Sequence, residues 1–409
     1  MNILVINHYA GSPYHGMEYR PYFLAKEWVS LGHSVTIVAS TESHLRINAP
    51  ETTGLLTEQW IDGIQYLWVR TTPYKDNGVK RVINIFNFVI KLIWNSKDIV
   101  NQVKPDAVIA SSTYPFDIYA AQAIAKKAKA KFIYEVHDLW PLTPVEIGGM
   151  SPYHPLIMLM QKAEDDGYRK ADRVVSMLPY ARSYMLSRGM KDHKFTCIPN
   201  GVHISDWQNS IQSLPTHHQA VLEELALKKH FLIGYAGYHG LANALFPMLE
   251  TALLMKESPI SFVLVGNGPL KEELELKAKR LGLTNIYFLP SITKNEIPTF
   301  LCKMDVLYIG WNKKRIYEYG VSPNKLMDYM MAAKPVIHSI DAGNDIVAES
   351  GCGISVPAEK PEQVKEAIEK LMRLTRSELL EMGNKGKEYV VLNHDYQILA
   401  KKFISVLSD

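Results

Sequence analysis

Short apolar runs alternate with longer stretches of helical periodicity along most of the chain. Runs at 3–7, 34–39 and 132–136 predict buried strands, and the stretch 20–31 between the first two predicts an amphipathic helix. Strands that alternate with helices of this length are typical of a parallel sheet covered by helices on both faces.

The alternation stops at Pro199-Asn200-Gly201-Val202 and then starts again at about residue 231. In the second half the predicted strands are 231–236, 261–265, 286–289, 306–309, 336–338 and 354–356. We therefore predict an α/β protein with two doubly wound, Rossmann-like domains that face a central cleft. The expected divisions are an N-terminal domain 1–200, a C-terminal domain 201–390, and a C-terminal helix 391–409 that packs back on the N-terminal domain.

The composition excludes some classes of function but does not indicate one. Hydrophobic residues make up 47% of the chain and charged residues 21%, which is ordinary for a globular protein. A net charge of +3 is too weak to indicate nucleic-acid binding. The three widely spaced cysteines predict neither a disulfide framework nor a metal cluster, so we expect a reducing cytoplasm. The first strand begins at once, so we expect no signal peptide.

The stretch 305–339 predicts a strand, a polar loop, a helix and a second strand. Ser322 is expected to cap the helix and Pro323 to occupy its first position. Lys325 then lies in the first turn, where free backbone N–H groups favour an anion. This pattern suits a nucleotide diphosphate. The alternative is an ordinary capped helix.

Two neighbours extend this candidate site. Asn324 and Asp328 share one helix face with Lys325, and the Asp328 carboxylate is free to bond ribose hydroxyls. The loop before the helix carries three cations, Lys313, Lys314 and Arg315. A solvated basic loop is the alternative interpretation of that segment.

Three more loops of the second domain follow strands, and ligands of open α/β sheets bind at such ends. Their candidate residues are Gly237, His239 and Asn243 in the first loop, Gly266, Asn267 and Gly268 in the second, and Pro290 in the third. Glycines there allow backbone N–H groups to approach a phosphate or a sugar. Tight strand-to-helix turns also use glycine for geometry alone, which is the alternative.

In the first domain, His137 follows a strand and is placed to bond a substrate hydroxyl. The alternative is a structural histidine fixed by Asp138. Arg20 is either an anion clamp or a salt-bridged residue. Glu146 lies in a loop that either contacts an acceptor or serves only as a turn.

The loop that carries Gly11 and Gly16 follows the first strand, so we expect it at the same edge of the sheet. Motifs for a catalytic Ser-His-Asp set, a zinc protease, a Walker loop and a dinucleotide fingerprint are missing from the sequence.

The segment 80–94 predicts an amphipathic helix with unusually many large apolar residues, among them Phe86, Phe88 and Trp94. Such a helix can lie in a membrane interface, with Lys80, Arg81 and Lys91 toward the headgroups. A buried core helix is the alternative.

The chain resembles the retaining glycosyltransferases of the GT-B class called family 4, and within them the bacterial O-antigen and capsule subgroup that includes the N-acetyl-L-fucosamine transferases. The similarity covers essentially the whole chain. It is carried by the segments 31–35 (LGHSV), 137–141 (HDLWP), 199–202 (PNGV), 237–243 (GYHGLAN), 265–269 (VGNGP) and 322–330 (SPNKLMDYM).

The resemblance implies a UDP-sugar donor bound mainly by the C-terminal domain and an undecaprenyl-diphosphate-linked saccharide acceptor bound by the N-terminal domain. It implies a peripheral protein on the inner face of the cytoplasmic membrane, and neither cofactor nor metal. The reaction would be front-face transfer with retention, in which the departing β-phosphate accepts the acceptor's proton.

The resemblance also assigns residues. The implied catalytic residues are His137, Lys325 and Glu318. The implied donor contacts are Gly11, Gly16, Gly237, His239, Asn243, Gly266, Asn267, Gly268, Pro290, Ser322, Pro323, Asn324, Lys325, Leu326 and Asp328. The implied acceptor contacts are Arg20, Asp138 and Glu146.

The sequence departs from the family pattern at two places. The usual pair of glutamates separated by seven residues becomes Gly320 and Asp328, and Glu318 lies two residues out of step. The loop where relatives hold the diphosphate with an Arg and a Lys offers His239 and Asn243 instead. The rival functions are a UDP-sugar epimerase of the same fold and a non-catalytic sugar-binding protein.

Overall fold

The computed structural model describes residues 1–74, 78–209 and 212–408, and the chain divides into two compact units. Unit 1 comprises Met1–Asn200, Tyr319–Ser322 and Tyr396–Asp409. Unit 2 comprises Gly201–Glu318 and Pro323–Asp395. The segment Tyr319–Ser322, which the sequence pattern gave to the second domain, thus belongs to the first unit.

Unit 1 is built on an eight-stranded sheet in the order β3-β4-β2-β1-β5-β6-β7-β8. The strands are β1 Asn2–Ile6, β2 Ser34–Ser40, β3 Leu56–Ile61, β4 Ile64–Val69, β5 Ala107–Ala110, β6 Lys131–Val136, β7 Arg173–Ser176 and β8 Phe195–Cys197. All neighbours pair in parallel except β3 with β4. That pair forms a hairpin, and its Asp62-Gly63 turn has φ of 49° and 77°, the geometry that favours Asp-Gly.

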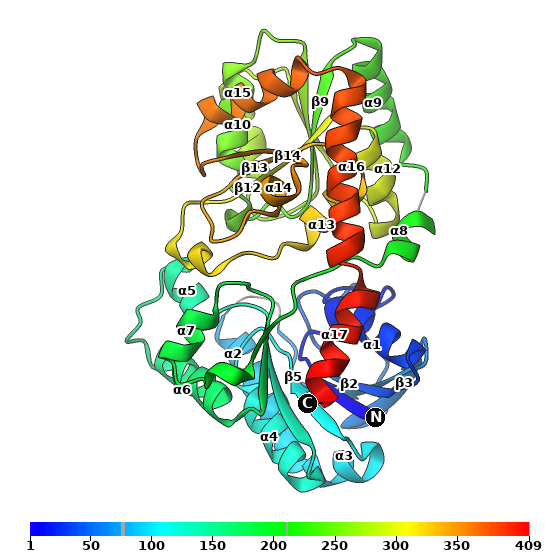
Figure 1. The fold of residues 1–409 in the computed structure, drawn as a ribbon, viewed down its shortest axis with the longest axis vertical. Coiled ribbons are helices and arrows are strands. Elements are labelled where there is room, and N and C mark those ends of the chain that lie inside the picture. Colours follow the sequence, from blue (N-terminus) through cyan, green and yellow to red (C-terminus); the bar gives the residue numbers. More distant parts are fainter. Residues whose placement is uncertain (75–77, 210–211, 409) are drawn as a thin grey trace. The chain divides into compact units, whose positions relative to one another are not determined.

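The helices of unit 1 connect these strands. They are α1 Arg20–Ser30, α2 Val79–Trp94, α3 Ser96–Val103, α4 Asp117–Ala128, α5 Leu142–Glu146, α6 Pro155–Lys170, α7 Arg182–Ser187, the short η1 Asp192–Lys194, and α17 Tyr396–Ser408 from the end of the chain. Figure 1 shows α17 beside α1. Trp28 of α1 donates its indole N–H to the Ala400 carbonyl (3.2 Å), and its ring meets Phe403 edge-on.

Unit 2 contains a fully parallel six-stranded sheet in the order β11-β10-β9-β12-β13-β14. Its strands are β9 Phe231–Ala236, β10 Ile260–Val265, β11 Ile286–Leu289, β12 Val306–Gly310, β13 Val336–Ser339 and β14 Gly353–Val356. Its helices are α8 Ile204–Asn209, α9 Thr216–Leu227, η2 Leu241–Asn243, α10 Leu245–Leu254, α11 Lys271–Arg280, η3 Lys294–Glu296, α12 Ile297–Cys302, η4 Arg315–Tyr319, α13 Asn324–Met331, α14 Ile346–Ser350, α15 Pro361–Met372 and α16 Arg376–Asn393.

Successive residues of the unit 2 strands belong alternately to two apolar clusters. Val263 and Leu307 belong to one cluster, whereas Phe262 and Val306 belong to the other. Because successive side chains of a strand point to opposite faces, helices must cover both faces of this sheet. The predicted fold class of two parallel-sheet, Rossmann-like domains is confirmed.

Helix α2 has a buried side, as the core interpretation of its sequence predicts, and an exposed apolar side, as the membrane-interface interpretation predicts. Phe88 and Leu92 are fully buried in unit 1, so this part of the helix is core. Ile83 and Trp94, by contrast, are 52% and 79% exposed. The expectation that Phe88 shares an exposed face with Trp94 is wrong, because their six-residue separation turns the two side chains about 120° apart around a helix with 3.6 residues per turn, and Phe88 falls on the core side. Within the described ranges, every helix is too short or too polar to cross a bilayer.

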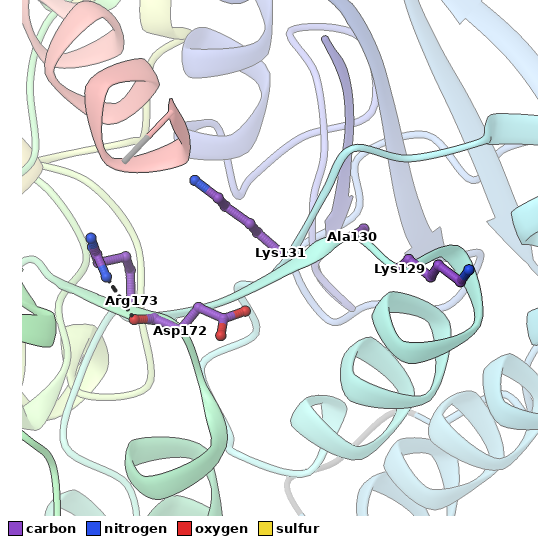
Figure 2. Close-up of a pocket in the computed structure, with 5 residues that line it drawn as sticks. All are labelled: Lys129, Ala130, Lys131, Asp172 and Arg173. Atoms are coloured by element: carbon purple, nitrogen blue, oxygen red, sulfur yellow. Dashed lines mark hydrogen bonds between the residues drawn. The ribbon is translucent and has the colours of Figure 1, made fainter.

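A cavity of about 310 Å³ opens in unit 1 where β6 and β7 begin (Figure 2). It is lined by Lys129, Ala130, Lys131, Asp172 and Arg173. The Lys131 amine and the Asp172 carboxylate are already engaged, by the Leu407 carbonyl and the Phe132 N–H. The cavity lies at the amino-terminal edge of the sheet, whereas ligands of such sheets bind at the carboxyl edge.

Candidate functional site

In unit 2, the loops after β9 and β10 lie against each other at the carboxyl edge of the sheet. The Gly237 N–H donates to the Val265 carbonyl (3.0 Å), and the His239 N–H donates to the Asn267 carbonyl (2.8 Å). A Cβ on Gly266 would stand 1.9 Å from the Gly237 carbonyl oxygen. Glycine at 266 is therefore required by this close approach, whether or not a ligand binds.

Lys325 of α13 extends to these two loops. Its Nζ donates to the Tyr235 hydroxyl (3.1 Å) and to the Asn243 side-chain oxygen, and it would lie 3.3 Å from a Cβ on Gly237. Burial lowers the pKa of the Lys325 amine to about 7. The structure thus brings together the lysine and the glycine loop that the sequence pattern proposed, and it gives the amine a poorly solvated position.

The start of α13 differs from the prediction by one residue. The helix begins at Asn324, and Pro323, with ψ of 128°, is the residue before it. The Ser322 hydroxyl does not cap the helix, because it accepts the Asn200 N–H (2.8 Å) within unit 1. The helix therefore presents its first N–H groups without a side-chain cap.

His239 is buried beside Lys325 and makes ring contacts with Tyr235 and Phe288. Neither of its ring nitrogens has a hydrogen-bond partner among the described residues. Burial, followed by the nearby Lys271 and Lys325 charges, lowers the pKa of His239 to about 4, so the ring is neutral at physiological pH. A neutral imidazole has one N–H to donate and one nitrogen to accept.

The remaining predicted donor contacts of unit 2 differ in their exposure and in their hydrogen-bond partners. Asn267 accepts the Gly268 N–H (2.9 Å), and the Pro290 carbonyl faces the ring nitrogen Nε2 of His218 (3.0 Å). Leu326 is fully buried in the core. Asn324 is exposed, and Asp328 is partly exposed one turn further along α13.

Glu318 and the basic loop lie in exposed ion pairs. Glu318 is paired with Arg315 (3.3 Å), and Lys313 lies 3.6 Å from Asp341. These two loop cations therefore have carboxylate partners in unit 2. The catalytic role assigned to Glu318 by the resemblance stays a prediction.

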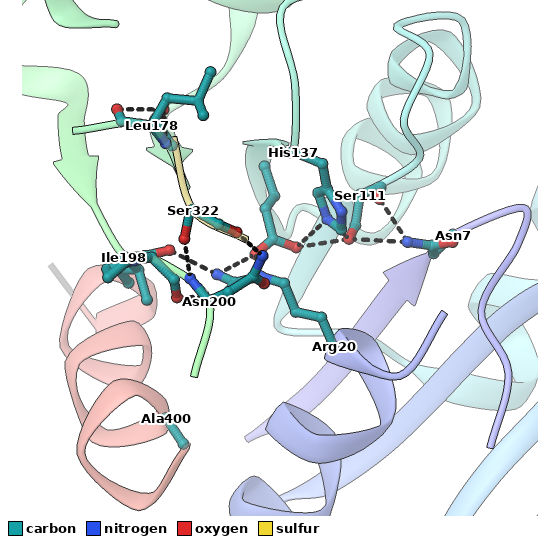
Figure 3. A network of polar contacts seen from close by, with 12 residues as sticks. Asn7, Arg20, Ser111, His137, Leu178, Ile198, Asn200, Ser322 and Ala400 are labelled. Atoms are coloured by element: carbon teal, nitrogen blue, oxygen red, sulfur yellow. Dashed lines mark hydrogen bonds and ion pairs between the residues drawn. The ribbon is translucent and has the colours of Figure 1, made fainter. Parts of the chain in front are cut away.

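In unit 1, a buried polar network forms at the carboxyl end of β6 (Figure 3). The Glu135 carboxylate is paired with the Arg20 guanidinium (2.9 Å), which also donates to the Pro199 and Ile198 carbonyls (2.6 and 2.9 Å). This arrangement matches the salt-bridged alternative for Arg20. The Arg20 and His137 charges overcome burial and lower the pKa of Glu135 to about 2.

His137 lies between two carboxylates. Its Nε2 is 2.9 Å from the Ser111 hydroxyl and 3.2 Å from Glu135 Oε2, and its Nδ1 is 3.5 Å from Glu18 Oε2. Burial alone would lower the pKa of His137, but its interactions with Glu135 and Glu18 raise it to about 9. At neutral pH the ring is an imidazolium.

If His137 has only a structural role, the sequence predicts that Asp138 fixes its ring. The Asp138 carboxylate instead accepts the Leu139 N–H (2.9 Å). Sequence reasoning missed Glu18, Ser111 and Glu135. The sequence contained a signal for Glu135, because an acid inside the apolar strand FIYEV requires a buried partner.

The other predicted residues of unit 1 have local contacts. A Cβ on Gly11 would stand 1.8 Å from the Gly16 carbonyl oxygen, so glycine at 11 serves the folding of its loop. Glu146 ends α5 and is partly exposed. An apolar groove of about 450 Å³ lies beside this helix, lined in part by Pro141, Val145 and Met158.

In the described ranges, no group of three or more His, Cys, Asp or Glu side chains is arranged to hold a metal ion.

Comparison with known proteins finds two family models. Residues 14–206 match the model described as Glycosyltransferase Family 4, and residues 232–374 match the model described as Glycosyl transferases group 1.

One sequence relative and two solved structures resemble the chain over nearly its full length. A protein of Escherichia coli K12 named as a colanic acid biosynthesis glycosyl transferase, WcaI, is 21% identical over 93% of each chain. The crystal structure of Anabaena HepE with UDP and glucose superposes with a TM-score of 0.69 over 100% of both chains at 14% identity. Sucrose-phosphate synthase of Thermosynechococcus elongatus superposes with a TM-score of 0.74 at 14% identity, over 99% of this chain and 98% of the other.

Proposed function

We propose that this chain, a glycosyltransferase of the GT-B fold with a family 4 domain followed by a group 1 domain, transfers a sugar from a UDP-sugar to a lipid-linked saccharide with retention of configuration. One solved structure supports the choice of a UDP-sugar donor, and one relative supports a role in polysaccharide biosynthesis. HepE binds UDP and glucose on the same fold, and WcaI is named for polysaccharide biosynthesis.

The observation that carries the proposal is the position of Lys325. Its amine lies beside Gly237, in the loop that packs on Gly266, at the edge where parallel sheets bind ligands. The start of α13 adds backbone N–H groups that no side chain caps, in the same turn of the chain. A diphosphate is the ligand that such a set of donors would bind.

The proposed chemistry places most of the catalytic work on electrostatics. As the bond from the anomeric carbon to the β-phosphate oxygen breaks, negative charge accumulates on that oxygen, which accepts the proton of the acceptor hydroxyl. The acceptor oxygen bonds to the anomeric carbon on the same face, and the nucleoside diphosphate leaves. Lys325 and the α13 N–H groups would stabilise this charge, and preorganised donors of this kind supply large rate factors. In this scheme His239 would contact the diphosphate or the sugar through its unpaired N–H.

The acceptor part of the proposal involves unit 1 and a membrane. Helix α2 exposes Ile83 and Trp94, and its sequence from Val79 to Trp94 has three cations and no acid. An apolar stripe with cations suits the interface of an anionic bilayer. We therefore propose that the protein is cytoplasmic, that α2 lies on the inner membrane surface, and that the acceptor is an undecaprenyl-diphosphate-linked saccharide.

The test is a panel of UDP-sugars incubated with and without bacterial membrane extract. Transfer of labelled sugar to the lipid fraction, with the anomeric configuration retained, is expected from one donor. Lys325→Met should reduce this transfer by about 100-fold or more while the protein stays folded. The matched control is Lys303→Met, an exposed lysine just before β12 at the amino edge of the same sheet, which should leave transfer nearly unchanged.

Three results would contradict the proposal. Near-normal transfer by Lys325→Met would remove the lysine from the donor site. Epimerised sugar without any acceptor would favour an epimerase. Binding without turnover in every mixture would favour a sugar-binding protein.

A further inference from the structure

Four charged side chains of unit 1 form a chain in which the signs alternate. Arg20 pairs with Glu135 at 2.9 Å, Glu135 with His137 at 3.2 Å, and His137 with Glu18 at 3.5 Å. The side chains of the first three are 3–6% exposed, whereas that of Glu18 is 25% exposed. Glu18 is therefore the most exposed side chain of the four, although its Oε2 atom, which faces His137, is itself buried.

The hydrogen bonds determine where the protons of His137 lie. The Ser111 hydroxyl donates its proton to Glu135 Oε2 (2.6 Å), so its oxygen can only accept from Nε2 of His137. Nε2 therefore carries a hydrogen. Nδ1 faces the Glu18 carboxylate, which is an acceptor when ionised, so a hydrogen on Nδ1 is favoured as well. Both ring nitrogens thus carry hydrogens.

Two carboxylates favour the protonated ring, and Glu135 is the larger contributor to the raised pKa of His137. Glu135 is also paired with Arg20, so its charge is shared between two cations. Glu18 Oε2, by contrast, has no hydrogen-bond partner among the described residues. The other acids that face His137 are Asp117 of α4, whose pKa burial raises to about 7, and Asp138, whose pKa burial also raises. Within the described ranges, Glu18 is therefore the ionised carboxylate beside the ring whose ion-pair partner is His137 and not an Arg or Lys.

We propose that Glu18 is the positioning residue of His137: it orients the ring and keeps it doubly protonated, so that His137 serves the sugar site as a fixed positive charge and a hydrogen-bond donor rather than as a base. The assignment of a sugar site to His137 rests on the proposed function. The proton state of His137 does not, and it can be measured without any ligand.

The 3.5 Å separation makes the contact between His137 and Glu18 a loose one. A charge-assisted N–H to carboxylate bond is ordinarily 2.7–2.9 Å long, so the Nδ1–H of His137 is only loosely held by Glu18. The Oε2 atom of Glu18 is buried, so a substrate would reach Nδ1–H only when the Glu18 side chain moves aside. A sugar hydroxyl is the ligand group whose chemistry suits this pair, because it can accept from Nδ1–H and donate to a carboxylate oxygen.

The experiment is an NMR titration of the histidine rings in the full-length protein, with the His137 signal assigned from its loss in His137→Gln. In the unmodified protein we expect His137 to remain protonated at both nitrogens at pH 7.5. In Glu18→Gln the midpoint should fall by on the order of one pH unit or more, as when an ion-pair partner is lost. Glu18→Asp should restore part of the shift, and Glu42→Gln is the control carboxylate of the same unit.

A His137 midpoint that Glu18→Gln leaves unchanged, in a protein that melts normally, would overturn the proposal. A second readout uses the transfer assay. Loss of the Glu18 charge should move the alkaline limb of the pH–rate profile to lower pH, whereas a merely structural role would lower the rate equally at every pH. If no donor supports transfer, the proposed function fails and the titration still decides the role of Glu18.

Discussion

Burial and charge oppose each other at Lys325. The amine is held among Tyr235, Asn243 and Gly237, where burial lowers its pKa to about 7. A buried amine regains its proton when an anion binds beside it, because the opposite charge favours the charged form. The lysine would therefore respond to the diphosphate rather than stand permanently charged.

This gives a prediction for UDP binding at pH 8. Most Lys325 amines are neutral there before binding, so each UDP should bring with it close to one proton from the buffer. Calorimetric titration in two buffers of different ionisation enthalpy measures this uptake. Lys325→Met should abolish it and Lys303→Met should preserve it, whereas uptake that persists in Lys325→Met would assign the proton to another group.

At the scale of single elements, α2 shows how a helix can serve a core and a surface together. Its buried side contains Phe88 and Leu92, and its exposed side contains Ile83 and Trp94. Sequence periodicity indicated an amphipathic helix correctly. It could not say which apolar residues face the core, because nearly every turn of the helix has large apolar side chains on more than one side.

The two sides of α2 should respond differently to substitution. Ile83→Ser with Trp94→Ser should weaken flotation with anionic vesicles and change the free energy of unfolding little. Phe88→Ala should cost about 3–5 kcal/mol of that free energy, as for other buried aromatic residues. Vesicle flotation and urea denaturation measure the two effects. Unchanged flotation of the double variant would show that the exposed side does not bind lipid.

At the scale of the whole molecule, His137 of unit 1 and Lys325 of unit 2 should contribute to the pH dependence of stability with opposite signs. His137 in unit 1 has a pKa raised to about 9, so the stability it contributes is fully present below about pH 6.5 and is lost as pH rises through 9. Lys325 in unit 2 has a lowered pKa, so the unfolded chain binds more protons between pH 7 and 10.5. Its contribution to stability therefore increases with pH over that window.

Variants isolate the two contributions. The difference in unfolding free energy between the unmodified protein and His137→Gln should shrink by on the order of 2–3 kcal/mol from pH 6.5 to pH 9. The corresponding difference for Lys325→Met should change in the opposite direction. Urea denaturation at a series of pH values measures both, and slopes of the same sign would contradict these charge assignments.

The sequence by itself determined the alternation of strands and helices, the break near residue 200, and the loops that follow the strands. These features depend on the local spacing of apolar residues and on turn chemistry, which act within a few residues. It also placed Lys325 and His137 at strand or helix ends. Their positions followed from the order of the elements alone.

Only the tertiary structure decided what those residues meet. Glu18 and Glu135 are 117 positions apart, yet both lie against His137. The Ser322 hydroxyl, which the sequence predicts as a helix cap, instead accepts the N–H of Asn200, 122 positions away. Desolvation and long-range pairing depend on which elements pack together, and no local pattern records that. The charges of His137 and Lys325 are therefore properties of the fold.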